Sequence, residues 1–212
     1  MSRILSKAIR TSPFGSRSCC AHCLDYVLRS GSVHWSPKKM LPKRTLVLGG
    51  AASGKSAFAE NLLTTSGLAP AYIATSRIWD DEIKNRVDVH KARRGPEWIN
   101  LEATNDLAPA LGKVPPTHAV LIDCATMWLT NHVMDGSDLA AAQAALLAAL
   151  ENAPAPVVIV SNEIGQGIVP MDADTRAFRE AHGRLNIALA AQADRVVQVV
   201  AGLPNVLKGA AS

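Results

Sequence analysis

The chain has 212 residues, of which 48% are hydrophobic, 19% charged and 4% aromatic, so it can form one domain with an aliphatic core. Its longest apolar stretch, residues 139–150, is too short to span a bilayer. The net charge of +4 comes from residues 1–43, which hold eight Lys or Arg and one acid, against fourteen bases and seventeen acids in the rest. The globular part is therefore slightly acidic, and we expect no nucleic-acid partner.

Residues 1–43 are rich in Ser, Arg and Lys and show no clear period. A transit peptide, a disordered tail and an artefact of start-site choice are all compatible with this composition, the last because Met40 lies just before the first predicted strand. We expect a basic, disordered extension over residues 1–43 without catalytic function. The catalytic domain is then predicted over residues 44–212.

Three cysteines cluster in this segment, at Cys19, Cys20 and Cys23, and Cys124 stands alone. A structural zinc site needs four ligands, and no second pair of cysteines is present. We interpret the thiols as incidental. Since no disulfide framework is indicated, the reducing cytoplasm is the expected location.

Apolar runs separated by glycine, proline and polar turns predict strands that alternate with helices. The predicted strands are residues 44–48, 71–74, 98–101, 119–122, 156–160, 195–200 and 205–208, the last as an edge strand. The predicted helices are residues 53–63, 80–93, 105–111, 126–132, 139–150 and 175–193. This alternation indicates an α/β fold with a mainly parallel sheet, in which ligands bind beyond the carboxyl ends of the strands.

The first predicted strand runs into a segment that fits the phosphate-loop pattern G-x-x-x-x-G-K-[ST]. Its residues are Gly49, Gly50, Ala51, Ala52, Ser53, Gly54, Lys55 and Ser56. Glycines let backbone N–H groups point at phosphate oxygens, and the following helix adds the positive end of its dipole. Lys55 can bind the outer phosphates and Ser56 can bind Mg²⁺. The alternative is an ordinary turn made of small residues.

Asp123 directly follows the apolar run at residues 119–122. An acid at the end of a buried strand, downstream of a phosphate loop, is typical of the carboxylate that holds Mg²⁺. We therefore predict a magnesium site at Ser56 and Asp123. An aspartate at a strand end is also common without any such role.

His90 lies near the end of the helix predicted over residues 80–93. Its basic neighbours are Arg86, Lys91, Arg93 and Arg94. Their field suits a phosphorylated ligand, and a neutral imidazole nitrogen can attack phosphorus. A surface or core role is the alternative for His90. The histidines interpreted as structural are His118, His132 and His182.

The segment 161–170 follows a predicted strand and contains Gly165, Gly167 and Pro170 among polar residues. Its position at the carboxyl end of that strand favours a functional loop over a tight surface turn.

Taken together, these segments resemble the bifunctional adenosylcobinamide kinase / adenosylcobinamide-phosphate guanylyltransferase family of cobalamin biosynthesis. The similar segments are residues 49–56, 72–76, 80–82 with Arg86 and His90, 98–102, 162–170, 178–179 and 183–186. The likeness extends from about residue 44 to residue 208. The His90 segment and residues 162–170 are its specific parts, because many proteins share the phosphate loop.

The resemblance implies a P-loop NTPase-like α/β fold and two reactions. A nucleoside triphosphate, ATP or GTP, phosphorylates adenosylcobinamide. GMP from GTP then passes through a guanylylated His90 to adenosylcobinamide phosphate, giving adenosylcobinamide-GDP. It also implies Mg²⁺ as cofactor, a corrinoid substrate and a homo-oligomer, often a trimer. The implied nucleotide contacts are residues 49–56, Ala74, Thr75, Ser76, Lys91, Ala92, Arg93, Arg94, Glu102 and Asp123.

The chain departs from the family's pattern in two places. Such enzymes generally lack a segment like residues 1–43, and Lys-Ala-Arg-Arg-Gly-Pro follows His90 where members often have Arg-Pro. The second departure blurs which arginine has which role.

Two other functions fit parts of the sequence. A P-loop small-molecule kinase without covalent nucleotidyl transfer would use His90 only to bind its acceptor. A GTP-dependent switch would usually carry an Asn-Lys-x-Asp segment, which this sequence lacks.

Overall fold

A computed structural model of the chain describes residues 41–77 and 94–209. The helix predicted over residues 80–93 lies outside these ranges, as do residues 1–40 of the predicted extension. The division into an extension and a catalytic domain therefore stays a prediction.

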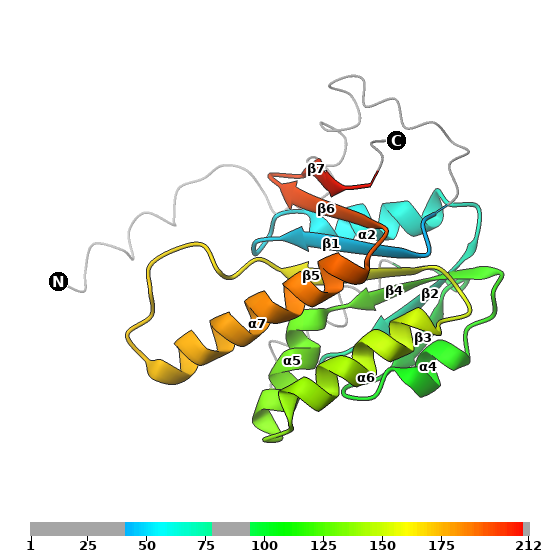
Figure 1. The fold of residues 1–212 in the computed structure, drawn as a ribbon. Helices are drawn as coiled ribbons and strands as arrows, with labels where there is room; N and C mark the ends of the chain where they lie inside the picture. The colour runs from blue at the N-terminus through cyan, green and yellow to red at the C-terminus, as the bar shows by residue number, and fades with distance from the viewer. Residues whose placement is uncertain (1–40, 78–93, 210–212) are drawn as a thin grey trace, which may run out of the picture. The chain divides into compact units, whose positions relative to one another are not determined.

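The described strands form one seven-stranded sheet in the order β3-β2-β4-β5-β1-β6-β7 (Figure 1). They are β1 (Arg44–Gly49), β2 (Ala69–Ala74), β3 (Ile99–Glu102), β4 (His118–Asp123), β5 (Val157–Asn162), β6 (Arg195–Val200) and β7 (Leu203–Lys208). Every neighbouring pair is parallel except β6 and β7. The predicted mainly parallel α/β fold is confirmed, and so is the predicted edge strand.

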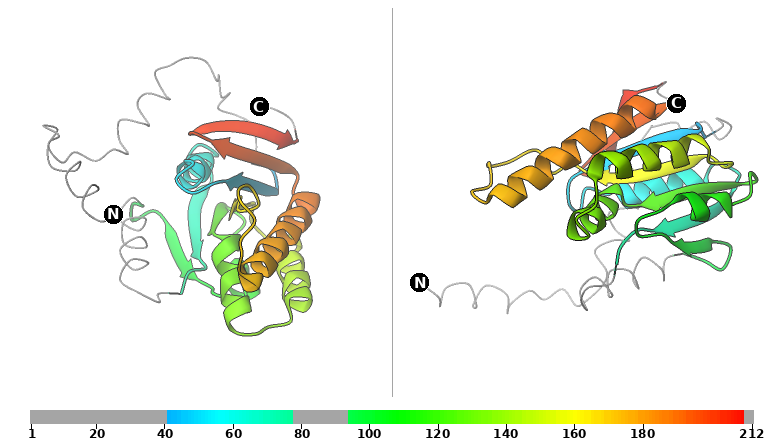
Figure 2. Two further views of the ribbon diagram at one scale, coloured as in Figure 1. Left: turned by 90° about the vertical axis from the view of Figure 1, so that its left-hand side faces the viewer. Right: turned by 60° about the horizontal axis from the view of Figure 1, so that its bottom comes forward.

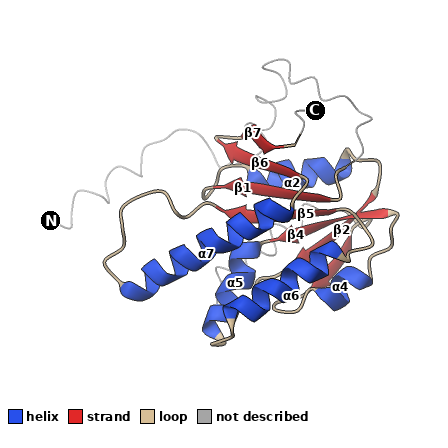
Figure 3. Ribbon diagram, in the orientation of Figure 1, coloured by secondary structure: helices blue, strands red, loops and turns tan. Residues whose placement is uncertain are grey.

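Helices cover both faces of the sheet (Figures 2 and 3). They are α2 (Lys55–Thr64), α4 (Ala108–Gly112), α5 (Ala125–Met134), α6 (Leu139–Glu151) and α7 (Ala173–Gln192). Residues of α2 belong to one hydrophobic cluster, whereas α4, α5, α6 and α7 contribute to another on the opposite face. In the described part of the chain, no helix has the length and hydropathy needed to cross a membrane.

The interior strand β4 shows why this sequence forms a covered sheet. Val120 and Ile122 face one cluster, whereas Ala119 and Leu121 face the other, and all four are fully buried. A continuous apolar run suits a strand that is covered on both faces. Burying each of the larger side chains contributes about 1.5–3 kcal/mol.

Most predicted boundaries differ from the structure by one to three residues, and two of the differences have a clear physical reason. The helix expected from residue 105 begins at Ala108, since Asp106 accepts a hydrogen bond from the backbone N–H of Ala108 at 3.0 Å. The strand expected to end at residue 160 extends through Ser161 and Asn162, which pair with Leu48 and Gly49 of β1.

Candidate nucleotide-binding site

The carboxyl ends of the parallel strands bring the predicted site residues to one edge of the sheet. Gly49, Ala74, Glu102 and Asp123 are the last residues of β1, β2, β3 and β4. Ala74 lies opposite both Asp123 and Glu102 in the strand register. Four segments that are far apart in the sequence therefore end at one edge of the sheet, with only β5 between β4 and β1, where ligands bind in such sheets.

The phosphate loop turns between β1 and α2. Lys55 is the first residue of α2 and donates a hydrogen bond from Nζ to the Gly50 carbonyl oxygen at 3.0 Å. No side chain in the described part of the chain caps α2, and its first turn carries no acid. The N–H groups at this helix start are thus suited to an anionic ligand, with Ser56 on the same turn.

Two positions of the loop require glycine for different reasons. Gly54 has φ +91°, in the left-handed region. A Cβ at Gly49 would lie 2.4 Å from Ser53 Oγ and 2.7 Å from the Val199 carbonyl oxygen. The pattern of glycines therefore reflects backbone conformation at one end and close packing at the other.

The turn between β6 and β7 supports this loop, a contact that sequence reasoning missed. Gly202 donates its N–H to the Ser53 carbonyl oxygen at 2.8 Å, and a Cβ at Gly54 would lie 3.2 Å from Gly202 Cα. Ala201 and Gly202 both have positive φ, as in a two-residue hairpin turn. The Ala-Gly pair between two predicted strands signalled the turn, but nothing in the sequence signalled that this turn contacts the phosphate loop.

Thr75 links the end of β2 to the residue after Asp123. Its buried hydroxyl donates to the Cys124 carbonyl oxygen and accepts from the Cys124 N–H, both at 2.8 Å. The Thr75 side chain is thus engaged inside the protein, and a nucleotide contact at Thr75 stays a prediction.

Asn131 on α5 is a second buried connector, and sequence reasoning missed it as well. Its Nδ2 donates to the carbonyl oxygens of Thr75 at 2.7 Å and Thr104 at 2.8 Å. These carbonyls follow β2 and β3, where the ladder no longer pairs them. An amide among the largely apolar residues of α5 was the only sequence signal.

Arg94 lies beside this edge, stacked on Tyr72 of β2. Its guanidinium carbon is 3.5 Å from the centre of the Tyr72 ring. Burial and then the negative charge of Asp123 raise the pKa of Tyr72, so the phenol is neutral. The same two causes raise the pKa of Cys124 to about 11. The other predicted residues of the basic segment, His90, Lys91, Ala92 and Arg93, lie outside the described residues.

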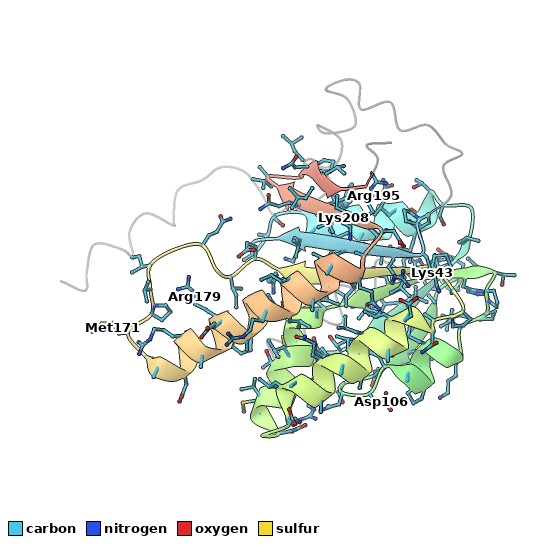
Figure 4. The ribbon with its side chains drawn as sticks, viewed as in Figure 1. Lys43, Asp106, Met171, Arg179, Arg195 and Lys208 are labelled. Atoms are coloured by element: carbon cyan, nitrogen blue, oxygen red, sulfur yellow. The ribbon has the colours of Figure 1, made fainter. Side chains whose placement is uncertain are left out.

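The segment that follows β5 forms an open loop rather than a tight turn. Arg179 of α7 donates to the carbonyl oxygens of Gly165 and Ile168, and Arg176 donates to that of Met171 at 2.6 Å. Figure 4 shows Arg179 beneath the loop and Met171 at its far end. The two arginines hold the loop by its backbone.

Ser56 and Asp123 have the chemistry that Mg²⁺ requires, because both offer oxygen at the same edge of the sheet. No cluster of three or more His, Cys, Asp or Glu in the described ranges could hold a metal by itself.

A strand, a glycine-rich turn and a helix carrying Lys and Ser, with an acid at the end of β4, define a P-loop nucleotide-binding protein. A family model described as cobinamide kinase / cobinamide phosphate guanyltransferase matches residues 45–207. The chain belongs to this family. The family resemblance and the enzyme class predicted from the sequence are thereby confirmed.

Three curated relatives are similar over nearly their whole length. The bifunctional adenosylcobalamin biosynthesis protein CobP of Pseudomonas aeruginosa is 43% identical over 169 residues, which are 78% of this chain and 98% of the relative. The proteins CobU of Escherichia coli and Salmonella typhimurium are 39% and 42% identical, each covering 74% of this chain and 96% of the relative.

Replacing Gly54 by Ala is expected to weaken GTP binding about tenfold. A left-handed conformation costs a residue with a Cβ about 1–2 kcal/mol, and relieving it would displace the loop from Gly202. Isothermal titration calorimetry with GTP measures the effect. Gly183→Ala is the control, because open space surrounds its added Cβ. Equal affinities of the Gly54 variant and the parent would contradict the role given to Gly54.

Proposed function

We propose that this chain phosphorylates adenosylcobinamide with a nucleoside triphosphate and transfers GMP from GTP to adenosylcobinamide phosphate through a guanylyl-His90 intermediate. Membership of the cobinamide kinase / cobinamide phosphate guanyltransferase family carries this proposal. The phosphate loop at the carboxyl edge of the sheet supports it, since both reactions begin from a nucleoside triphosphate. For His90 the support is its sequence setting among basic residues.

The described residues have defined roles in this proposal. The N–H groups at the start of α2 and the ammonium group of Lys55 bind the phosphates and stabilise their negative charge. Ser56 and Asp123 would hold Mg²⁺, which when bound neutralises further phosphate charge. The remaining proposed nucleotide contacts are Ala74, Thr75, Ser76, residues 91–94 and Glu102.

The covalent step uses the imidazole of His90. A neutral ring nitrogen attacks the α-phosphorus of GTP, an N–P bond forms, and the bond to the departing pyrophosphate breaks. A phosphate oxygen of adenosylcobinamide phosphate then attacks the same phosphorus. The N–P bond breaks, which regenerates His90 and gives adenosylcobinamide-GDP.

Incubation with α-³²P-GTP and Mg²⁺, followed by denaturation, tests the covalent intermediate. We expect label that is lost in acid and retained in base, as for a phosphoramidate. The His90→Ala variant should not be labelled, although it can retain kinase activity. His118→Ala is the control. Because His118 lies at the end of β4 opposite to Asp123, this variant should be labelled like the parent. Lys55→Ala should impair both activities.

Two results would contradict this assignment. Label on the His90→Ala variant would place the nucleotide on another residue. A folded parent that binds GTP without acquiring label would instead indicate the simple kinase, in which His90 only binds the acceptor.

Guanylylation should decline below about pH 6.5, the ordinary pKa of histidine, because a protonated imidazole has no lone pair for attack. The reaction therefore needs the deprotonated form, which is lost as the pH falls. Initial rates of label incorporation between pH 5 and 8 measure this dependence. A profile that is flat down to pH 5 would argue against His90 as the nucleophile.

We also propose that the enzyme is cytoplasmic and uses ATP and GTP as substrates.

We further propose that the chain forms a homotrimer. The loop after β5 supports self-association. Ile168 and Met171 are 95% and 99% exposed, while the loop carbonyls are occupied by Arg176 and Arg179. Apolar side chains that are held outward in this way suit an interface between copies.

Light scattering coupled to size-exclusion chromatography should give about three times the 22.4 kDa chain mass for the parent. Met171→Glu is expected to lower that mass, because it would bury a charge in the proposed interface. Met134→Glu, at another exposed methionine, is the matched control and should not. A monomeric parent at 50 µM protein would contradict the oligomer.

A further inference from the structure

A buried hydrogen-bonded group connects α5, β5 and α7 behind the nucleotide edge. The Thr126 hydroxyl accepts the N–H of Asn162 at 3.0 Å and lies 2.9 Å from Nε2 of His182. His182 is 1% exposed and Thr126 8%, so water does not compete for these groups. The interpretation of His182 as a structural residue did not anticipate these partners.

Nε2 of His182 lies close to two hydroxyl oxygens, those of Thr126 at 2.9 Å and Ser161 at 3.4 Å. Its Nδ1 lies 3.5 Å from Nδ2 of Asn186. Burial lowers the pKa of His182, against an opposing effect of Glu163, and so favours the neutral ring. The ring is thus held between α5 and β5.

The Asn162–Glu163 backbone lies between the two halves of the proposed phosphate and magnesium site. Strand β5 pairs with β4, which ends at Asp123, and with β1, which ends at Gly49. The N–H of Glu163 donates to the Gly49 carbonyl oxygen at 2.9 Å. One short stretch of backbone is thus bonded to the first residue of the phosphate loop and to the helix that follows Asp123.

Helix α7 holds the same backbone from a second direction. Asn186 donates from Nδ2 to the Asn162 carbonyl oxygen at 3.1 Å and accepts the Ser161 hydroxyl at 2.6 Å. Both backbone groups of Asn162 are therefore fixed, by Thr126 and by Asn186.

We propose that Thr126 and His182 are positioning residues that set the placement of Asp123 relative to the phosphate loop, and with it the gain in nucleotide affinity that Mg²⁺ provides. Neither residue is placed against the nucleotide; they act through the backbone of Asn162 and Glu163. The inference rests on the proposed function, because it takes Ser56 and Asp123 as the magnesium residues. Groups that orient metal ligands in this way typically change metal affinity about 10- to 100-fold.

The test compares equilibrium binding of N-methylanthraniloyl-GTP, followed by fluorescence, in Mg²⁺ and in EDTA. The ratio of the two Kd values measures the gain from Mg²⁺ and needs no turnover. In Thr126→Val, which keeps the side-chain shape but removes the hydroxyl, we expect this ratio to fall about tenfold, with the Kd in EDTA within about twofold of the parent. Thr126→Ser should keep the parent's ratio.

Thr130→Val is the matched control on the same helix. The Thr130 hydroxyl donates to the Thr126 carbonyl oxygen at 2.9 Å and takes no part in the contact with β5. A purely structural role for Thr126 would lower the melting temperature and the folded fraction, but it would leave the ratio of Kd values unchanged. Circular dichroism on the same samples separates these effects.

If Thr126→Val does not fold, Thr126→Ala replaces it, since its smaller side chain leaves room for a water to pair with the Asn162 N–H. The same tenfold loss is expected. If a variant without the hydroxyl keeps the parent's ratio of Kd values, while the parent is still labelled on His90, the inference is wrong and the proposed function stands. A parent that shows no magnesium gain would overturn the proposed magnesium site, and the inference with it.

Discussion

The parallel pairing of β4, β5 and β1 is the constraint on which the rest of the site depends. Parallel strands direct their carboxyl ends to one edge, and the register places Gly49 beside Asn162 and Asp123 beside Val160. The pairing persists because these strands are apolar and covered by helices on both faces. A one-residue shift would turn each side chain to the other face and separate the phosphate loop from its acid.

Buried polar side chains at this edge hydrogen-bond to backbone groups beyond the ends of the strands. Thr75 pairs with both backbone groups of Cys124, and Asn131 donates to the carbonyl oxygens of Thr75 and Thr104. Thr126 and Asn186 do the same for Asn162. An unpaired buried group costs about 1–3 kcal/mol, so these side chains hold the strand ends in single positions. That rigidity suits a site in which phosphates and a metal must be held together.

The loop after β5 follows a different rule. Its carbonyls are held by arginines of α7, yet its apolar side chains face outward. The nucleotide edge is thus built from internal contacts, whereas this loop carries the interface proposed between copies of the chain.

The sequence by itself determined the fold class and the phosphate loop and predicted Asp123 as a magnesium acid, because these depend on local patterns: apolar runs, glycine spacing and an acid at a strand end. The family likeness also lay in the sequence, and it covers residues 45–207. Only the tertiary structure placed Gly202 under the phosphate loop and joined Thr126 to His182, 56 residues apart. Such contacts depend on strand order and helix packing, which bring distant residues together without leaving a periodic trace.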